Sequence, residues 1–96
     1  MSEEYENVFI GDKPIGSYLT AGLWALSQDE PKPIRLLGRG NNIKTTVDVA
    51  EILKRQMISP ETIIEIGSES HNERKVSTIS IILIGKKKKE KKNGKK

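Results

Sequence analysis

Hydrophobic and polar residues follow two kinds of pattern along this chain. Short apolar runs bounded by turn residues predict strands at residues 7–10, 34–38, 62–66 and 76–84. Apolar residues that recur at spacings of three and four predict helices at residues 15–26 and 43–57. The order β-α-β-α-β-β predicts an α+β fold, a two-layer sandwich in which helices cover a sheet.

Each predicted helix has an apolar stripe that should face the sheet. The first stripe consists of Ile15, Tyr18, Leu19, Gly22, Leu23 and Leu26. The second consists of Ile43, Val47, Ala50, Leu53 or Lys54, and Met57. Glycine lowers intrinsic helix propensity by up to about 1 kcal/mol, so Gly22 does not stabilise the helix by itself. Its place on the apolar side instead indicates close packing against a neighbouring element.

The predicted connections are polar. Pro14 suits the first turn of a helix, and Ser59-Pro60 should stop the second helix. Asn41 or Asn42 is expected to cap that second helix by accepting hydrogen bonds from its first free N–H groups. The segment GSESHNERK, residues 67–75, is predicted to be a polar hairpin loop.

The last predicted strand ends in a run without alternation, residues 81–84. A strand with one solvated face should alternate between apolar and polar residues, so both faces of this one are expected to be covered. Two explanations remain open, a dimer interface and burial within the monomer.

Charge is distributed unevenly between a body and a tail. Residues 85–96 hold eight lysines and one glutamate, a net charge of +7, and the lysine run is predicted to be disordered. The other 84 residues hold nine basic and twelve acidic side chains, a net charge of −3. We therefore expect one domain at residues 1–84, whose anion-binding surface depends on arrangement and not on composition.

Several classes of protein are disfavoured. The chain has no cysteine, no apolar stretch near the roughly 20 residues that span a bilayer, and an acidic N-terminus without a signal-peptide core. These features predict an intracellular protein that does not act in membranes. The single histidine, His71, has no oriented partner in the sequence, and no phosphate-binding or dinucleotide motif occurs. We expect no enzymatic activity, no cofactor, no metal and no small-molecule substrate.

Candidate binding residues lie in the turns that precede the helices. A helix N-terminus attracts phosphate through free N–H groups and the helix dipole, and a preceding arginine can add a bidentate grip. The candidates at the second helix are Arg39, Asn41, Asn42 and Lys44, and a solvated, capped loop is the alternative. At the first helix Lys13 is the candidate, with an ordinary strand-to-helix turn as the alternative.

Two more cationic segments are candidates. Arg74 and Lys75 lie in the predicted hairpin loop, which also carries Glu69 and Glu73, so a plain solvated hairpin is the alternative. In the tail, lysine runs attract nucleic acid without reading its sequence. The tail candidates are Lys86, Lys87, Lys88 and Lys89. A nuclear-import signal or simple solubility is the competing use of that run.

Three motifs in this order resemble the Alba family of archaeal chromatin and RNA-binding proteins. The first is VFIGDKP at residues 8–14, and the second is RGNNI followed by VDVAEI within residues 39–52. The third is Gly67-Ser68 before the hairpin, followed by VSTI at residues 76–79. The resemblance implies a homodimer or a heterodimer with a paralogue, and a fold similar to the C-terminal domain of bacterial translation initiation factor three.

The resemblance also implies how nucleic acid is bound. It places Lys13 at the dimer centre, Arg39 in the second loop, and Arg74 and Lys75 on hairpin arms along a duplex. It also implies packing of dimer against dimer, where Met57 stands at a position commonly held by a larger apolar residue. Asp12 replaces a family lysine that can be acetylated.

A second departure lies in the second loop, where Asn41 replaces a common arginine. The hairpin is moreover short and carries acids, so the body's electrostatic grip should be weakened.

The sequence thus predicts largely sequence-independent binding of double-stranded DNA, RNA or both by a dimeric architectural protein of the chromosome or nucleoid in the cytoplasm. The alternative is a weakly binding heterodimer partner or ribonucleoprotein subunit that acts mainly through protein contacts. Phosphate contacts carry no base sequence, so these residues do not separate DNA from RNA. Because the four aromatic residues mostly fall on core-like positions, we do not expect a base-stacking platform.

Overall fold

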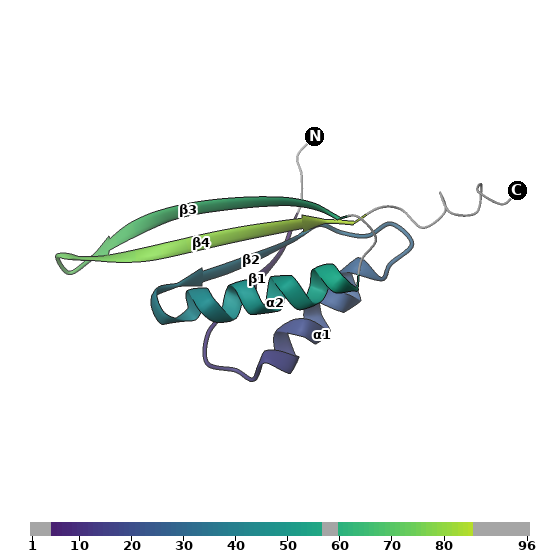
Figure 1. Cartoon of the computed structure of the whole chain (residues 1–96), viewed down its shortest axis with the longest axis horizontal. Coiled ribbons are helices and arrows are strands. Elements are labelled where there is room, and N and C mark those ends of the chain that lie inside the picture. The colour runs from purple at the N-terminus through teal and green to yellow at the C-terminus, as the bar shows by residue number, and fades with distance from the viewer. Residues whose placement is uncertain (1–4, 57–59, 86–96) are drawn as a thin grey trace, which may run out of the picture.

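A computed structural model describes residues 5–56 and 60–85, and within them two helices cover one face of a four-stranded sheet (Figure 1). The elements are β1 (Glu6–Phe9), α1 (Ile15–Leu26), β2 (Ile34–Arg39), a 3-10 turn (Gly40–Asn42), α2 (Ile43–Arg55), β3 (Glu61–His71) and β4 (Arg74–Ile84). The predicted α+β two-layer fold is confirmed.

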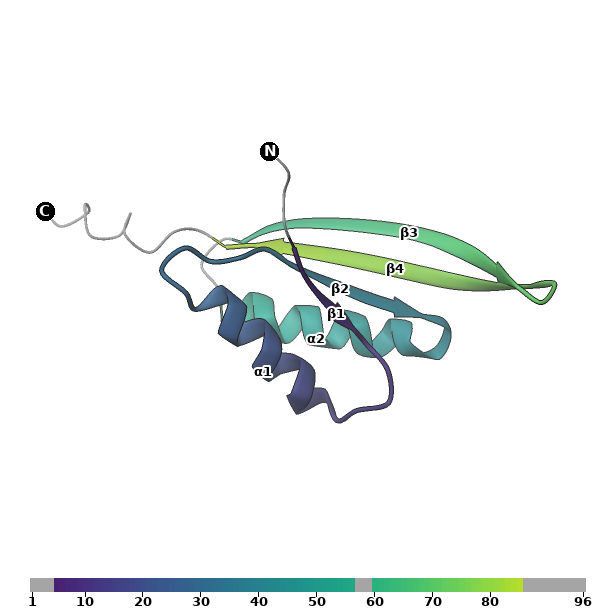
Figure 2. The ribbon, with the colours of Figure 1, turned by 180° about the vertical axis from the view of Figure 1, so that it is seen from behind.

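The strands lie in the order β1-β2-β4-β3. β1 and β2 are parallel, whereas β4 runs antiparallel to both of its neighbours. Both helices lie on the same side of the sheet, as the two opposite views show (Figure 2). The other side carries neither helix, and we call it the open face.

Strand register determines which side chains form the core. Leu36 in β2 lies opposite Ile81 in β4, and Ile34 lies opposite Leu83, so all four point towards the helices because alternate residues share a face. They are buried together with residues of both helices, such as Leu53 of α2. Burial of apolar surface in this single layer holds the helices on the sheet.

The observed helix stripes differ in part from the predicted ones. Ile15 and Leu23 of α1 and Val47 of α2 are each more than a third exposed. Short side chains occupy the contact instead, namely Gly22 and Ala25 in α1 and Thr46, Val49 and Ala50 in α2. Small residues let the helices approach the sheet closely, which a pattern of large apolar residues does not reveal.

The predicted role of Gly22 is confirmed. A Cβ at this position would lie 2.7 Å from Leu53 Cδ1 and 3.3 Å from Ile34 Cδ1. The glycine therefore allows α1 to pack directly on α2 and β2.

The prediction of a hairpin loop at residues 67–75 is wrong. β3 and β4 pair continuously from Glu61↔Ile84 to His71↔Arg74, and only Asn72 and Glu73 form the turn. Both turn residues have positive φ, 49° and 69°, which suits a tight two-residue hairpin turn. Backbone pairing does not require apolar side chains, so the polar segment is strand. Its residues 68–77 extend past the end of β2 as a two-stranded projection, which we call the arm.

The last strand is buried within the monomer. Ile81 and Leu83 face the helices, while Ile82 points to the open face and is still only 7% exposed. Of the two explanations for residues 81–84, burial inside the chain therefore fits the structure, and this run gives no support for a dimer interface.

Some predictions fall outside the described residues. Helix α2 ends at Arg55, whereas Met57 and Ser59 lie in the segment that is not described, as do the tail lysines 86–89. Among the described residues, neither helix is long and apolar enough to cross a membrane.

Candidate nucleic-acid interface

Three cationic segments lie at one end of the sheet. Because β1 and β2 are parallel, the loops that follow them leave from the same end, where the Ile10 N–H still donates to the Leu37 carbonyl oxygen at 2.8 Å. The arm projects from this end too, since β4 pairs with β2 only as far as Arg39↔Thr78. Figures 1 and 2 show both loops and the arm on the same side of the molecule.

The loop after β1 is held in place by a tyrosine hydroxyl. The backbone N–H groups of Gly11 and Lys13 both donate to Tyr18 Oη, at 2.8 and 3.0 Å. Tyr18 is itself buried, so its ring is fixed in the core while its oxygen organises the loop. The Lys13 side chain is exposed and extends from an ordered backbone. No side-chain hydrogen bond caps α1, so Asp12 does not serve as its cap.

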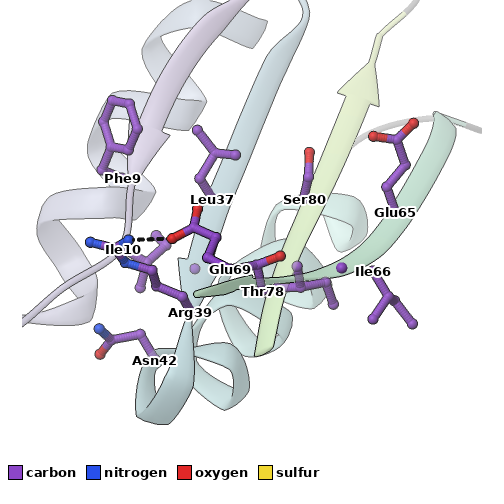
Figure 3. Close-up of a pocket in the computed structure, with 13 residues that line it drawn as sticks. Phe9, Ile10, Leu37, Arg39, Asn42, Glu65, Ile66, Glu69, Thr78 and Ser80 are labelled. Carbon is purple, nitrogen blue, oxygen red and sulfur yellow. Dashed lines mark hydrogen bonds and ion pairs between the residues drawn. The ribbon is translucent and has the colours of Figure 1, made fainter. Parts of the chain in front are cut away.

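Arg39 ends β2 on the open face and is engaged by the arm. Its Nη1 donates to Glu69 Oε1 at 2.6 Å (Figure 3). The same nitrogen lies 3.4 Å from His71 Nε2. Glu69 and His71 share the face of β3 towards which Arg39 points, because Arg39, Thr78 and Gly67 are in register. The arginine is thus neutralised by a neighbouring carboxylate.

The pKa of the Glu69 carboxyl is lowered by its hydrogen bond with His71 and, second, by that with Arg39. His71 Nε2 lies 3.1 Å from Glu69 Oε1. Stabilising contacts to the ionised form explain the direction of this shift. The Glu69 carboxylate therefore stays ionised at pH values below the ordinary pKa of a glutamate, and there it still binds Arg39.

The second helix begins differently from the prediction. Asn42 occupies the cap position but makes no side-chain capping bond, so neither asparagine acts as the expected cap. A 3-10 turn precedes the helix, and in it the Ile43 N–H donates to the Gly40 carbonyl oxygen. Thr46 Oγ1 donates to the Asn42 carbonyl oxygen at 2.8 Å, which ties this turn to α2.

Lys44, in the first turn of α2, forms an ion pair with Asp48 at 2.8 Å. The hydrogen bond and charge of Asp48 raise the pKa of Lys44. Asn41 beside it is exposed. These side chains are accessible, although Asp48 offsets the charge of the lysine.

Arg74 and Lys75 lie on opposite faces of the arm. Successive strand residues alternate, so Arg74 shares the open face with Glu69 and His71, while Lys75 points to the helix side. Both are exposed. The structure therefore gathers the predicted cations at one end of the sheet and distributes them over both sides of that end.

A hollow with a volume of about 570 Å³ lies beside Arg39 (Figure 3). Its lining includes a register-aligned row across the sheet, formed by Phe9, Leu37, Ser80 and Glu65. The Ser80 hydroxyl oxygen is buried and has no hydrogen-bond partner among the described residues. In those residues no cluster of three or more histidine, aspartate or glutamate side chains could hold a metal ion.

Comparison with known proteins matches the sequence profile of the Alba family to residues 6–81. The chain belongs to the Alba family. The predicted membership is thereby confirmed, and the matched region includes both helices, the arm and all of the sheet except the end of β4. This Alba-family chain is similar to the DNA/RNA-binding protein Alba of Methanothrix thermoacetophila, with 33% identity over an alignment of 86 residues. The match covers 83% of this chain and 96% of that protein. It is also similar to the DNA/RNA-binding protein Alba of Nanoarchaeum equitans, with 34% identity over an alignment of 88 residues. This match covers 82% of this chain and 97% of that protein.

Solved structures agree with the Alba fold. Alba from Thermoplasma volcanium superposes with a TM-score of 0.65 at 27% identity, over 82% of this chain and 99% of that one. ALBA1 from Trypanosoma brucei superposes with a TM-score of 0.67 at 17% identity, over 97% and 84% of the two chains, and this likeness shows the fold alone.

Sequence reasoning missed three residues at this end. Tyr18 was assigned only to the core, although a buried tyrosine usually needs a partner for its hydroxyl, and that rule was a usable signal. Glu69 was assigned to a loop, so its contact with Arg39 was not foreseen. Phe9 is expected to be core-like, yet its side chain is 72% exposed. The expectation that the aromatic residues mostly fall on core-like positions is wrong for Phe9.

Proposed function

We propose that this Alba-family chain binds double-stranded DNA, RNA or both without enzymatic activity and largely without reading base sequence, as an architectural protein of the chromosome or nucleoid in the cytoplasm. The observation that carries this proposal is the convergence of Lys13, Arg39 and the arm cations at one end of the sheet. Cationic side chains gathered in this way are suited to contact phosphates. Phosphate contacts fix the orientation of the protein on the nucleic acid but carry no sequence information. The relatives named DNA/RNA-binding protein Alba support the same function.

We further propose that the protein acts as a dimer, with itself or with a paralogue. Ile64 and Ile66 are 56% and 79% exposed on the helix side of β3. β3 is an edge strand, so the backbone groups along its outer side have no neighbouring strand to pair with among the described residues. The two isoleucine side chains on this strand are likewise left uncovered. A second copy placed against β3 would cover them and bring two sets of loops to one nucleic acid.

Binding to a duplex tests the function. Arg39→Ala should weaken affinity for duplex DNA and RNA, and removal of residues 85–96 should lower both affinity and salt dependence. Each neutralised phosphate contributes about 0.9 to the logarithmic salt slope on duplex DNA. Lys32→Ala is the matched control, because Lys32 lies before β2 at the other end of the sheet and pairs with Glu6 at 3.6 Å. If neither change alters duplex binding, these contacts are wrong.

A second candidate function is supported by the two neutralised cations. The pairs Arg39–Glu69 and Lys44–Asp48 leave less positive charge at the proposed interface. A chain of this kind could act mainly by pairing with a more basic paralogue or within a ribonucleoprotein. Negligible duplex binding by a body lacking residues 85–96, restored by addition of a basic paralogue, would favour this candidate.

A further inference from the structure

We propose that the open face of the sheet binds a single-stranded segment of RNA or DNA by stacking a base on the ring of Phe9. This inference rests on the proposed nucleic-acid binding and adds a ligand form and a site that the phosphate-binding loops do not provide.

Phe9 is a large apolar side chain that the fold itself does not use. Its strand neighbours Val8 and Ile10 point into the core and are buried, whereas the Phe9 side chain is 72% exposed. An aromatic ring buries up to about 150–250 Å² when it is covered, so an exposed one offers considerable binding surface. Every base has an apolar face that stacks on such a ring.

The surroundings of Phe9 form a built surface. Phe9 lies directly beside Leu37, and this row continues to Ser80 and Glu65 across the sheet (Figure 3). The hollow lined by this row, about 570 Å³, falls in the usual range of ligand-binding pockets.

Guanidinium groups flank the ring on both sides. Arg35 and Arg39 stand two residues before and two after Leu37 on the same face of β2, about 13 Å apart at the ordinary strand rise. Arg35 contacts neutral groups, donating from Nε to Asn7 Oδ1 at 3.0 Å and lying 5.6 Å from the centre of the Tyr5 ring. A phosphate on either side of a stacked base could therefore meet a guanidinium.

The carboxylates set the direction of the bound strand. Glu65 lies at the far end of the row on β3, and Glu69 engages Arg39 through Nη1 from the same side. Phosphates are repelled there, so the nucleic-acid backbone should follow β1 and β2 past Arg35. Both contacts of Arg39 with the arm use Nη1, and Nη2 makes no hydrogen bond or ion pair among the described residues.

A single strand fits this surface better than a duplex or a second copy. Bases in a duplex are stacked on each other, and a protein ring reaches them only where they are unstacked. A second copy would require a continuous apolar area, but Asn7, Arg35 and Arg39 interrupt the surface around Phe9. The exposed isoleucines 64 and 66 lie on the other side of the sheet.

The test compares Phe9→Leu and Phe9→Tyr of the full chain in binding to an oligouridine, a matching oligothymidine and a duplex. Stacking contributes about 1–3 kcal/mol per base, so Phe9→Leu should weaken single-strand affinity roughly 5- to 150-fold, whereas Phe9→Tyr should retain it. The two oligonucleotides show whether the ribose hydroxyl matters. Trp24→Leu is the matched control, since Trp24 is 65% exposed on α1, and the side chains of Ser27 and Gln28 donate hydrogen bonds to its backbone carbonyl oxygen, which the substitution keeps.

Three results would overturn the inference. They are an unchanged single-strand affinity of Phe9→Leu, an equal loss in Trp24→Leu, or a change of oligomeric state in Phe9→Leu by light scattering, which would assign Phe9 to a protein contact. Duplex binding should stay within about twofold in both Phe9 variants, since duplex bases are not available for stacking. Failure of the phosphate-binding proposal would instead appear as unchanged duplex affinity in Arg39→Ala, so the two outcomes are distinguishable.

Discussion

At the scale of single residues, the end of the sheet is shaped by competition for Arg39. A guanidinium binds a carboxylate and a phosphate with the same donor geometry, so Glu69 at 2.6 Å occupies part of the group that a phosphate would use. This pair is exposed to water, where such pairs are weak and are exchanged readily for a stronger anion. Glu69 should therefore lower nucleic-acid affinity without preventing binding.

Replacement of Glu69 tests this competition. Glu69→Gln should raise duplex affinity by a few-fold, because Arg39 is released and one negative charge leaves the interface. Equilibrium titration at low salt measures the effect, and Glu61→Gln is the control, since Glu61 is exposed at the other end of β3. Lower affinity in Glu69→Gln would show that the carboxylate positions Arg39 for binding.

The pKa of Glu69 provides a second prediction. Because the hydrogen bonds with His71 and Arg39 lower this pKa, His71→Ala and Arg39→Ala should each raise the pKa of Glu69 towards its ordinary value. NMR titration of the carboxyl carbon measures both. A carboxyl whose pKa is lowered by folding stabilises the folded state above its ordinary pKa, and that contribution is lost as the pH falls through the lowered value. A pKa that both variants leave unchanged would contradict the assigned contacts.

At the scale of elements, the connection from β2 to α2 depends on a close contact. A Cβ at Gly38 would lie 1.9 Å from Thr46 Oγ1 and 3.0 Å from the Asn42 carbonyl oxygen. The helix start and the strand end are thus in direct contact, which places Arg39 at a fixed position before α2. The absence of a side chain at this residue is what permits the arrangement.

Gly38→Ala should lower the free energy of unfolding by about 1–3 kcal/mol, as overpacked sites do. Chemical denaturation of the full chain measures it. Gly16→Ala is the control: a Cβ there meets nothing within 4 Å, and alanine favours a helix by up to about 1 kcal/mol. A Gly38→Ala protein as stable as the parent would contradict the close contact.

The elements also show how far sequence reasoning extends. All six helices and strands were predicted in the correct order, because apolar spacing reports a buried face directly. The arm was missed since residues 67–71 and 74–75 are polar and pair only through their backbones. The exposure of Phe9 was missed for a related reason. In the short run at residues 7–10, the sequence does not show which side chains point into the core. A shift of the strand register by one residue would exchange the buried and exposed faces.

At the scale of the whole molecule, two surfaces have different characters. The helix side of edge strand β3 exposes Ile64 and Ile66, while the end of the sheet exposes cations. One surface is therefore suited to a protein partner and the other to nucleic acid. A dimer formed through β3 would leave the open face near Phe9 accessible, since β1 and β3 are the opposite edges of the sheet.

If the proposed dimer forms through β3, Ile66→Asp should convert it to a monomer, because a charge would be buried at the contact. The side chain is 79% exposed in the protomer, so the fold itself should tolerate the change. Sedimentation equilibrium measures the mass, and Trp24→Asp introduces the same charge at an exposed apolar position on α1. An Ile66→Asp protein that remains dimeric would place the interface elsewhere.

The most direct measurement of the central claim is the salt dependence of duplex binding by two triple variants with equal loss of charge. Lys13→Ala/Arg74→Ala/Lys75→Ala removes cations at the loop end of the sheet, and Lys32→Ala/Lys54→Ala/Arg55→Ala removes three from the opposite end. If the loop end holds phosphates, the first variant should lose up to about 2.7 in logarithmic salt slope for each bound protomer, and the second should keep nearly the parent slope. Equal slopes for the two variants would contradict the claim that the position of these cations, and not their number, determines binding.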